Sequence, residues 1–135
     1  MRARTAVGLM ALLGLAALPG CGGTGQAEVD GAVTYDGRPV PAGAIAFVPL
    51  EGQGLSAGGT VLDGRYHVPA EVGPKTGKYR VEIRWAKPTG RKYRSETGAM
   101  LEVTEEGLPA KYNDKSELTA DVKPGKNTID FDLAK

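Results

Sequence analysis

The segment "KYRVEIRW" at residues 78–85 has the clearest secondary-structure pattern in this 135-residue chain. Charged residues alternate there with four apolar ones, Tyr79, Val81, Ile83 and Trp85. Successive side chains of a β-strand point to opposite faces, so this alternation predicts a strand with one face in a core and the other in solvent. The segment therefore indicates a protein built from β-sheet.

The same period of two recurs on both sides of this segment. We expect further strands at residues 29–35, 44–49, 60–62, 65–68, 99–103, 117–122 and 128–133. The pair Asp63-Gly64 predicts a tight hairpin, because these residues adopt the positive φ angles that such a turn needs. Residues 36–43 form a turn cluster, and residues 51–59 and 86–98 are expected to be loops, the second long and polar.

About seven short strands separated by Gly, Pro and Asp turns predict an all-β fold, a single antiparallel β-sandwich. The length allows one domain, which we place at residues 29–135. Outside the first 20 residues no segment has a helical stripe. The residues expected to be buried between two sheets include Phe47, Val81, Ile83, Phe131 and Leu133.

Residues 1–20 are typical of a cleaved signal peptide. Arg2 and Arg4 precede the apolar stretch at residues 6–18, which is shorter than the roughly 20 residues that span a membrane. The alternative is a buried core helix. The terminal position and the Pro19-Gly20 break disfavour it.

Cys21 is the single cysteine of the chain, so it cannot form an internal disulfide. The sequence "LPGC" at residues 18–21 resembles the lipobox of bacterial lipoproteins, although Pro19 departs from the usual small or aliphatic residue. This resemblance implies cleavage before Cys21, lipid on its thiol and acylation of the new amino terminus, which together give stable anchoring. Residues 21–28 would then be a lipidated cysteine with a flexible tether. A reactive thiol is the alternative, but no partner residues accompany it.

Residues 29–47, 58–69 and 77–83 resemble the carboxypeptidase regulatory-like domain, a transthyretin-like (prealbumin-like) Greek-key sandwich. The matching positions are Gly31, Gly37, Pro39, Val40, Gly43, Ala44, Asp63, Gly64, Tyr66, Gly77 and Tyr79. Residues 108–133 are similar to the ending of small bacterial lipoproteins that carry this domain. The resemblance implies the fold and an accessory, adhesive or scaffolding role, and it implies no activity.

Catalytic and metal chemistry is not expected from this sequence. Transthyretin-like hydroxyisourate hydrolases use two histidines, an arginine and a C-terminal Tyr-Arg-Gly-Ser, whereas this chain has only His67 and closes with "FDLAK". We expect His67 to be exposed on its strand, without partners for catalysis or metal binding. The carboxylates Asp121, Asp130 and Asp132 should face solvent rather than calcium. We expect no cofactor and no isopeptide bond, since no acid falls on a predicted core face. Tyr112 is expected to tie down a corner of the sandwich.

Residues 78–94 carry seven basic residues and one acid, Glu82, whereas acids predominate from residue 102 onward. The candidate partner-binding surface within this stretch consists of Arg84, Lys87, Arg91, Lys92, Tyr93 and Arg94. The alternative is ordinary solvated surface. Over the whole chain 17 Lys+Arg nearly balance 16 Asp+Glu, which gives no electrostatic reason to expect nucleic acid.

The sequence therefore predicts an exported lipoprotein of the cell envelope with a non-catalytic binding or structural role. Gly22 after Cys21 resembles lipoproteins that are sorted to the outer membrane. The expected partners are the membrane, through the lipid, and an anionic lipid, an acidic glycan or another envelope protein. Two alternatives remain: a small transthyretin-type hydrolase, and an untethered secreted module that binds carbohydrate or metal.

Overall fold

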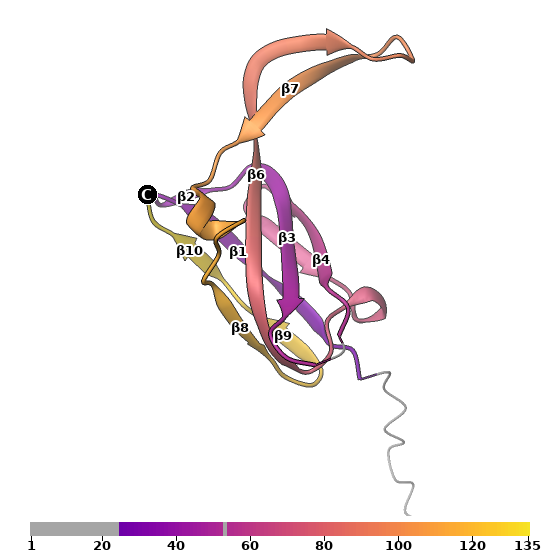
Figure 1. Cartoon of the computed structure of the whole chain (residues 1–135), viewed down its shortest axis with the longest axis vertical. Helices are drawn as coiled ribbons and strands as arrows, with labels where there is room; N and C mark the ends of the chain where they lie inside the picture. Colours follow the sequence, from indigo (N-terminus) through magenta and orange to yellow (C-terminus); the bar gives the residue numbers. More distant parts are fainter. Residues whose placement is uncertain (1–24, 53) are drawn as a thin grey trace, which may run out of the picture.

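The computed structural model describes residues 25–52 and 54–135. The predicted signal peptide and Cys21 lie outside the described residues. The described chain is all-β and sandwich-like, as predicted (Figure 1). Its helical residues are confined to two single-turn 3₁₀ helices, η1 (Ala70–Val72) and η2 (Ala110–Tyr112).

Ten strands are present in the described residues, more than the seven or so expected. They are β1 (Glu28–Tyr35), β2 (Arg38–Pro39), β3 (Ala42–Pro49), β4 (Ala57–Leu62), β5 (Arg65–Val68), β6 (Gly77–Arg94), β7 (Met100–Glu106), β8 (Thr119–Val122), β9 (Lys126–Thr128) and β10 (Phe131–Leu133). The strand expected at residues 128–133 is divided into β9 and β10. Residues 57–59, expected in a loop, begin β4.

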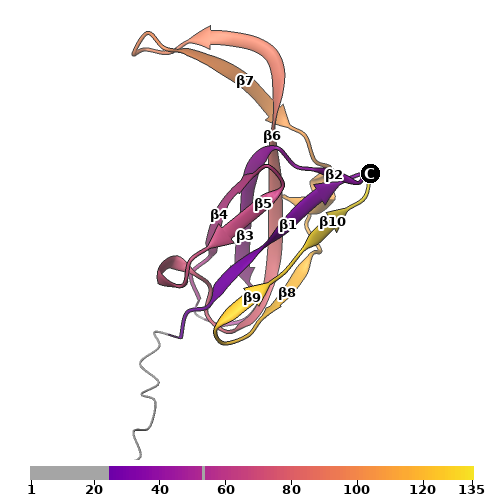
Figure 2. The same ribbon diagram turned by 180° about the vertical axis from the view of Figure 1, so that it is seen from behind.

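The strands form one continuous hydrogen-bonded sheet in the order β10-β1-β5-β4-β3-β6-β7, with β2 and β9 on β1 and β8 on β6. The ladders are antiparallel except those of β1 with β9 and with β10, which are parallel. The sheet curls around one core, and Figure 2 shows β8 and β9 side by side where the two ends of the curled sheet approach each other. There Gly125, in the turn between them, accepts a hydrogen bond of 2.9 Å from the amide of Glu28.

Strand β1 begins earlier than the sequence predicted. Ala27 is buried, and its amide donates to the carbonyl of Pro74 at 2.7 Å. Gln26 forms an isolated bridge with Lys75. Residues 26–28, expected in a flexible tether, are therefore part of the folded body, because they find backbone partners that the local sequence does not reveal.

Strand β6 is the longest element and confirms the pattern at residues 78–85. It pairs with β8 near Gly77, with β3 over the next residues and with β7 toward Arg94. Tyr79, Val81 and Ile83 are buried. The long loop expected from residue 86 is wrong: residues 86–94 continue β6, and the chain turns at residues 95–99 into β7.

The core contains all five residues predicted for it, and its aromatic rings pack together. Phe47 has no exposed surface, and its ring centre lies 6.2 Å from that of Tyr66 and 6.3 Å from that of Tyr79. Phe131 lies 6.3 Å from Tyr66. Such tilted and edge-on rings stabilise one another beyond the area they bury.

Two local features predicted from the sequence are present: the Asp63-Gly64 hairpin turn and the corner tyrosine Tyr112. Asp63 and Gly64 have φ angles of 50° and 74°, which close the predicted hairpin between β4 and β5. The Tyr112 hydroxyl donates to the carbonyl of Ala134 at 2.7 Å and accepts from the amide of the same residue at 3.0 Å. Tyr112 therefore ties the segment after β7 to the end of β10, as expected of a corner tyrosine.

Truncating the centre of the core should be costly. We expect Phe47→Ala to lower the free energy of unfolding by about 3–5 kcal/mol, because it removes a large buried ring and leaves a cavity. Denaturant unfolding followed by circular dichroism measures this change. The matched control is Leu55→Ala, since Leu55 is 91% exposed and should shift stability by less than about 0.5 kcal/mol. Equal losses in the two variants would contradict this core.

Candidate functional site

The candidate site is a two-stranded arm, residues 86–106, that projects from the body. Figure 1 shows it rising beyond the curled sheet and bending to one side. The arm is built from the outer half of β6 and from β7. In the described chain β7 pairs only with β6. Two-stranded hairpins bury little surface, so nearly all side chains of the arm are exposed.

The arm and the first residue of β1 lie at opposite ends of the body. Strand β1 begins at Glu28, beside the turn that contains Gly125, and ends at Tyr35. The Tyr35 ring lies 6.3 Å from the ring of Trp85, the last residue of β6 before the arm. Figures 1 and 2 show the same arrangement from two sides.

The pairing register of the arm sets basic residues of β6 opposite acidic residues of β7. Lys87 is the partner of Glu105, and Lys92 is the partner of Glu102. Over residues 86–106 four cations balance four acids, so the arm as a whole carries no net charge. The basic character of residues 78–94 in the linear sequence is therefore locally compensated once the chain folds, as opposite charges across strands attract.

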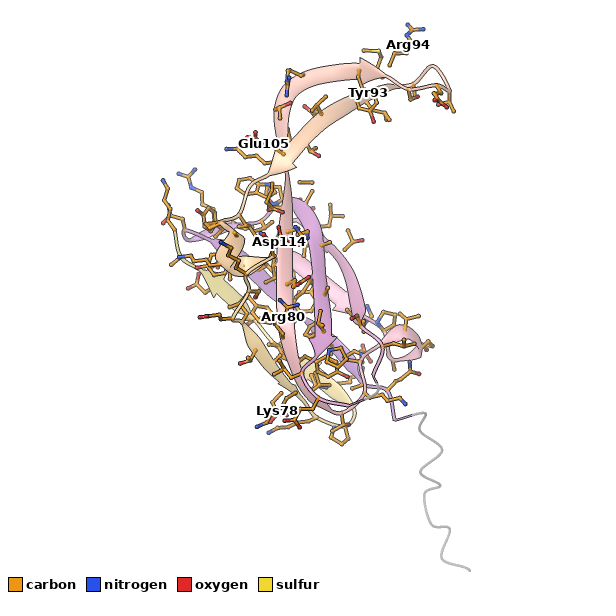
Figure 3. The ribbon with its side chains drawn as sticks, in the orientation of Figure 1. Lys78, Arg80, Tyr93, Arg94, Glu105 and Asp114 are labelled. Atoms are coloured by element: carbon orange, nitrogen blue, oxygen red, sulfur yellow. The ribbon has the colours of Figure 1, made fainter. Side chains whose placement is uncertain are left out.

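The structure separates the cations that the sequence grouped together. Lys78 and Arg80 lie low on the body, far from the arm (Figure 3), and Arg80 pairs with Glu82 at 2.9 Å. Arg84 also belongs to the body. Its guanidinium contacts Asp114 at 2.6 Å, and this hydrogen bond raises the pKa of Arg84.

Five of the six predicted surface residues belong to the arm. Lys87 lies at its root, and Arg91, Lys92, Tyr93 and Arg94 lie further out. Within residues 25–52 and 54–135, none of these four cations forms an ion pair. They are therefore available to a partner, whereas Arg84 is not.

Exposed apolar side chains accompany the outer cations. Tyr93 is 52% exposed and stands opposite Leu101, which is 43% exposed. Met100 is 58% exposed and stands opposite Arg94. The sequence singled out Tyr93 but missed the two residues on β7, because only the register shows that Leu101 shares a face with Tyr93 and that Met100 shares the opposite face with Arg94.

The root of the arm is held by contacts to the body. Glu106 accepts hydrogen bonds of 3.0 Å from the amides of Trp85 and Leu108. Gly107 donates to the carbonyl of Trp85 at 2.9 Å. A Cβ at Gly107 would lie 2.4 Å from the indole, so only glycine allows this approach. These contacts fix where the arm leaves the body.

His67 and the outer aspartates take part in strand contacts. His67 is exposed as predicted, but its Nε2 lies 2.9 Å from a carboxylate oxygen of Glu28, a partner that the sequence did not suggest. Asp130 accepts from the amide of Ala32 at 2.8 Å, and Asp132 accepts from the Thr34 hydroxyl at 2.6 Å. Asp121, Asp130 and Asp132 are exposed, as predicted, and the last two also hold β10 and the residue before it against β1.

Two further findings concern metals and membranes. Among the residues that the structure describes, no three His, Cys, Asp or Glu side chains are grouped as a metal ion would require. No helix in that part of the chain has the length and apolar character needed to cross a bilayer.

Comparison with known proteins adds no relative. No family model, no characterised protein and no solved structure matches the chain. The resemblance to the carboxypeptidase regulatory-like domain stays a prediction from the quoted residues.

The arm should be dispensable for folding. Replacing residues 88–104 by Asn-Gly would connect Lys87 to Glu105, which are already paired, through a turn that favours hairpins. We expect the melting temperature to change by only a few degrees, because the replaced residues bury almost nothing against the core. Thermal unfolding followed by circular dichroism tests this. A loss as large as that of Phe47→Ala would mean that the arm is part of the folding unit.

Proposed function

We propose that this protein is a lipid-anchored, non-catalytic module of the cell envelope that holds an arm out toward an acidic partner. The observation that carries the proposal is the arm itself. It is an extended hairpin with unpaired cations and exposed apolar side chains, at the end of the body opposite the start of β1. Exposed features of this kind, carried by a rigid scaffold, are typical of binding elements.

The position of the arm favours a partner beyond the anchoring membrane. A lipid on Cys21 would leave only a few residues between the membrane and Gln26, where the body begins. The membrane would then lie near the start of β1, and the arm would point away from it. An acidic glycan or another envelope protein therefore suits the arm better than a lipid headgroup of the same membrane.

The charges of the arm favour a weak and local interaction. Lys92 and Arg94 share one face of the arm and can approach a chain of carboxylates together, and Arg91 lies on the other face with Tyr93. The glutamates of β7 limit the reach of this attraction, and salt screens such exposed charges within about 10 Å. Tyr93 and Leu101 would add apolar contact. We therefore propose salt-sensitive binding through side chains of the outer arm.

The resemblance to bacterial lipoproteins and to the carboxypeptidase regulatory-like domain agrees with this role. Of the two alternative classes, a transthyretin-type hydrolase would need a second histidine, which the chain lacks. An untethered secreted module that binds carbohydrate or metal would differ from the proposed protein in that Cys21 carries no lipid. Lipid labelling therefore separates that alternative from the proposal.

Cys21 should determine membrane attachment. In a bacterial host, we expect the wild-type protein to incorporate labelled fatty acid and to sediment with membranes. Cys21→Ser should abolish labelling and release or stall the protein, because the acylated thiol is lost. Metabolic labelling with membrane fractionation measures both effects. A Cys21→Ser variant that stays membrane-bound and identically processed would contradict the anchor.

Reversing the outer cations should remove binding of an acidic polymer. The test uses the full-length protein in neutral phosphatidylcholine vesicles, which are pelleted with a soluble polyuronic acid at low and high salt. We expect retention of the polymer by wild type at low salt, and its loss at high salt or in Arg91→Glu/Lys92→Glu/Arg94→Glu.

The matched control for this experiment is Lys123→Glu/Lys126→Glu. These residues follow β8 and begin β9, two strands that Figure 2 shows away from the arm. This variant should keep its binding, and all three proteins should melt at similar temperatures. Equal retention by the arm variant, or none by the wild type at low salt, would contradict the proposed role of the arm.

A further inference from the structure

A cleft of about 590 Å³ lies where the arm joins the body. Its lining is largely apolar: Tyr35 from the end of β1, Pro39 and Pro41 from the segment around β2, and Trp85 from the root of the arm. The Tyr35 and Trp85 rings are 6.3 Å apart and tilted by 59°, so they form two walls of different orientation. Small-molecule sites in proteins are concave and apolar with a few placed polar groups, and this cleft has that composition.

The polar groups around the cleft are mainly cationic. The side chains of Arg38, Lys87 and Lys135 line it, together with one acidic side chain, Asp36. None of these three cations forms an ion pair within the described residues. The Lys87 ammonium lies 5.7 Å from the centre of the Trp85 ring, a cation–π distance that keeps its charge beside the apolar wall.

We propose that this cleft binds a single carboxylated sugar unit, such as a uronic acid, of the acidic glycan class assigned above to the arm. Its carboxylate would pair with Arg38 and Lys87, since guanidinium binds carboxylate in two-pronged geometry. Its flat C–H face would lie on the aromatic and proline walls. A simple inorganic anion would leave the apolar walls unused, and a hydrocarbon would leave the cations unused.

This inference rests on the proposed function for its ligand class but places recognition at different residues. The cleft would read one sugar unit at the root, and the outer arm would hold the rest of the polymer by charge. The two sites therefore respond to different variants. A short oligomer reports on the cleft, and a long polymer reports on the arm.

The experiment uses the only tryptophan of the chain, Trp85, as a reporter inside the cleft. The full-length protein in neutral detergent micelles is titrated with a galacturonic acid trimer while Trp fluorescence is recorded. We expect a saturable change that the methyl-esterified trimer, which lacks the charges, produces only at concentrations about tenfold higher or more. Arg38→Gln should lower the affinity for the acidic trimer about tenfold, and Tyr35→Ala should lower the affinity for both trimers.

The matched control is Arg91→Gln/Lys92→Gln, which removes two cations from the outer arm and should leave the trimer titration unchanged. Absence of a saturable change, or equal responses to the acidic and esterified trimers, would overturn the cleft. If the trimer responds to Arg91→Gln/Lys92→Gln and not to Arg38→Gln, the arm alone binds and the cleft inference fails. In that case the proposed function stands. Conversely, the trimer response could depend on Arg38 while no polymer is retained in the vesicle experiment. That result would support binding in the cleft and contradict binding by the arm.

Discussion

The ladder between β3 and β6 is the interaction on which the rest of the structure depends. Ile45 pairs with Ile83 and Phe47 pairs with Val81, and all four side chains are buried on the same face. The two backbones approach so closely that a Cβ on Gly43 would lie 1.9 Å from the carbonyl oxygen of Arg84. Burial of these four residues stabilises the body by several kcal/mol, since each full burial is worth about 1.5–3 kcal/mol. It also fixes the direction in which β6 leaves the body.

Strand β6 continues from the body into the arm. The packing of β6 in the core therefore also sets the direction in which the arm projects. A loop at residues 86–98 would have let the cations sample many positions. A paired strand, held at its root by Glu106 and Gly107, restricts them to one side of the body. Ordering the binding residues in advance lowers the entropy lost on binding, which matters most for weak contacts. This ordering supports the proposed role of the arm in binding.

The sequence predicted the body well because burial leaves a period-two signal. Val29, Val33, Val81 and Ile83 all lie on the face that this period assigned to the core. The same logic failed at residues 86–94, where neither face is buried and Pro88 and Gly90 suggest a loop. Polar hairpins of this kind carry no hydrophobic period for a sequence to show.

The candidate sites could be predicted only in part, because they depend on pairings between distant residues. Tyr35 and Trp85 are far apart in the sequence, and only the curl of the sheet brings them to one cleft. The placement of Lys87 and Lys92 opposite Glu105 and Glu102 depends on the register of the arm. Charge counts along the chain therefore overstated the net positive charge of this region, and the structure shows only that Tyr93 and the three cations around it lie on the same strand.

The edges of the arm indicate how it would contact a partner. An exposed strand edge invites another strand, and proteins prevent this with proline, bulges and charged side chains. The arm has all three: Pro88 lacks an amide hydrogen, the register shifts between Pro88 and Lys92, and β7 carries three glutamates. Strand addition is thus disfavoured on both edges. The side chains on the faces of the arm therefore remain for recognition. These side chains include cations, Tyr93 and Leu101. The proposed partner is thus an acidic chain that contacts the faces of the arm, and not a strand that joins the edge of the sheet.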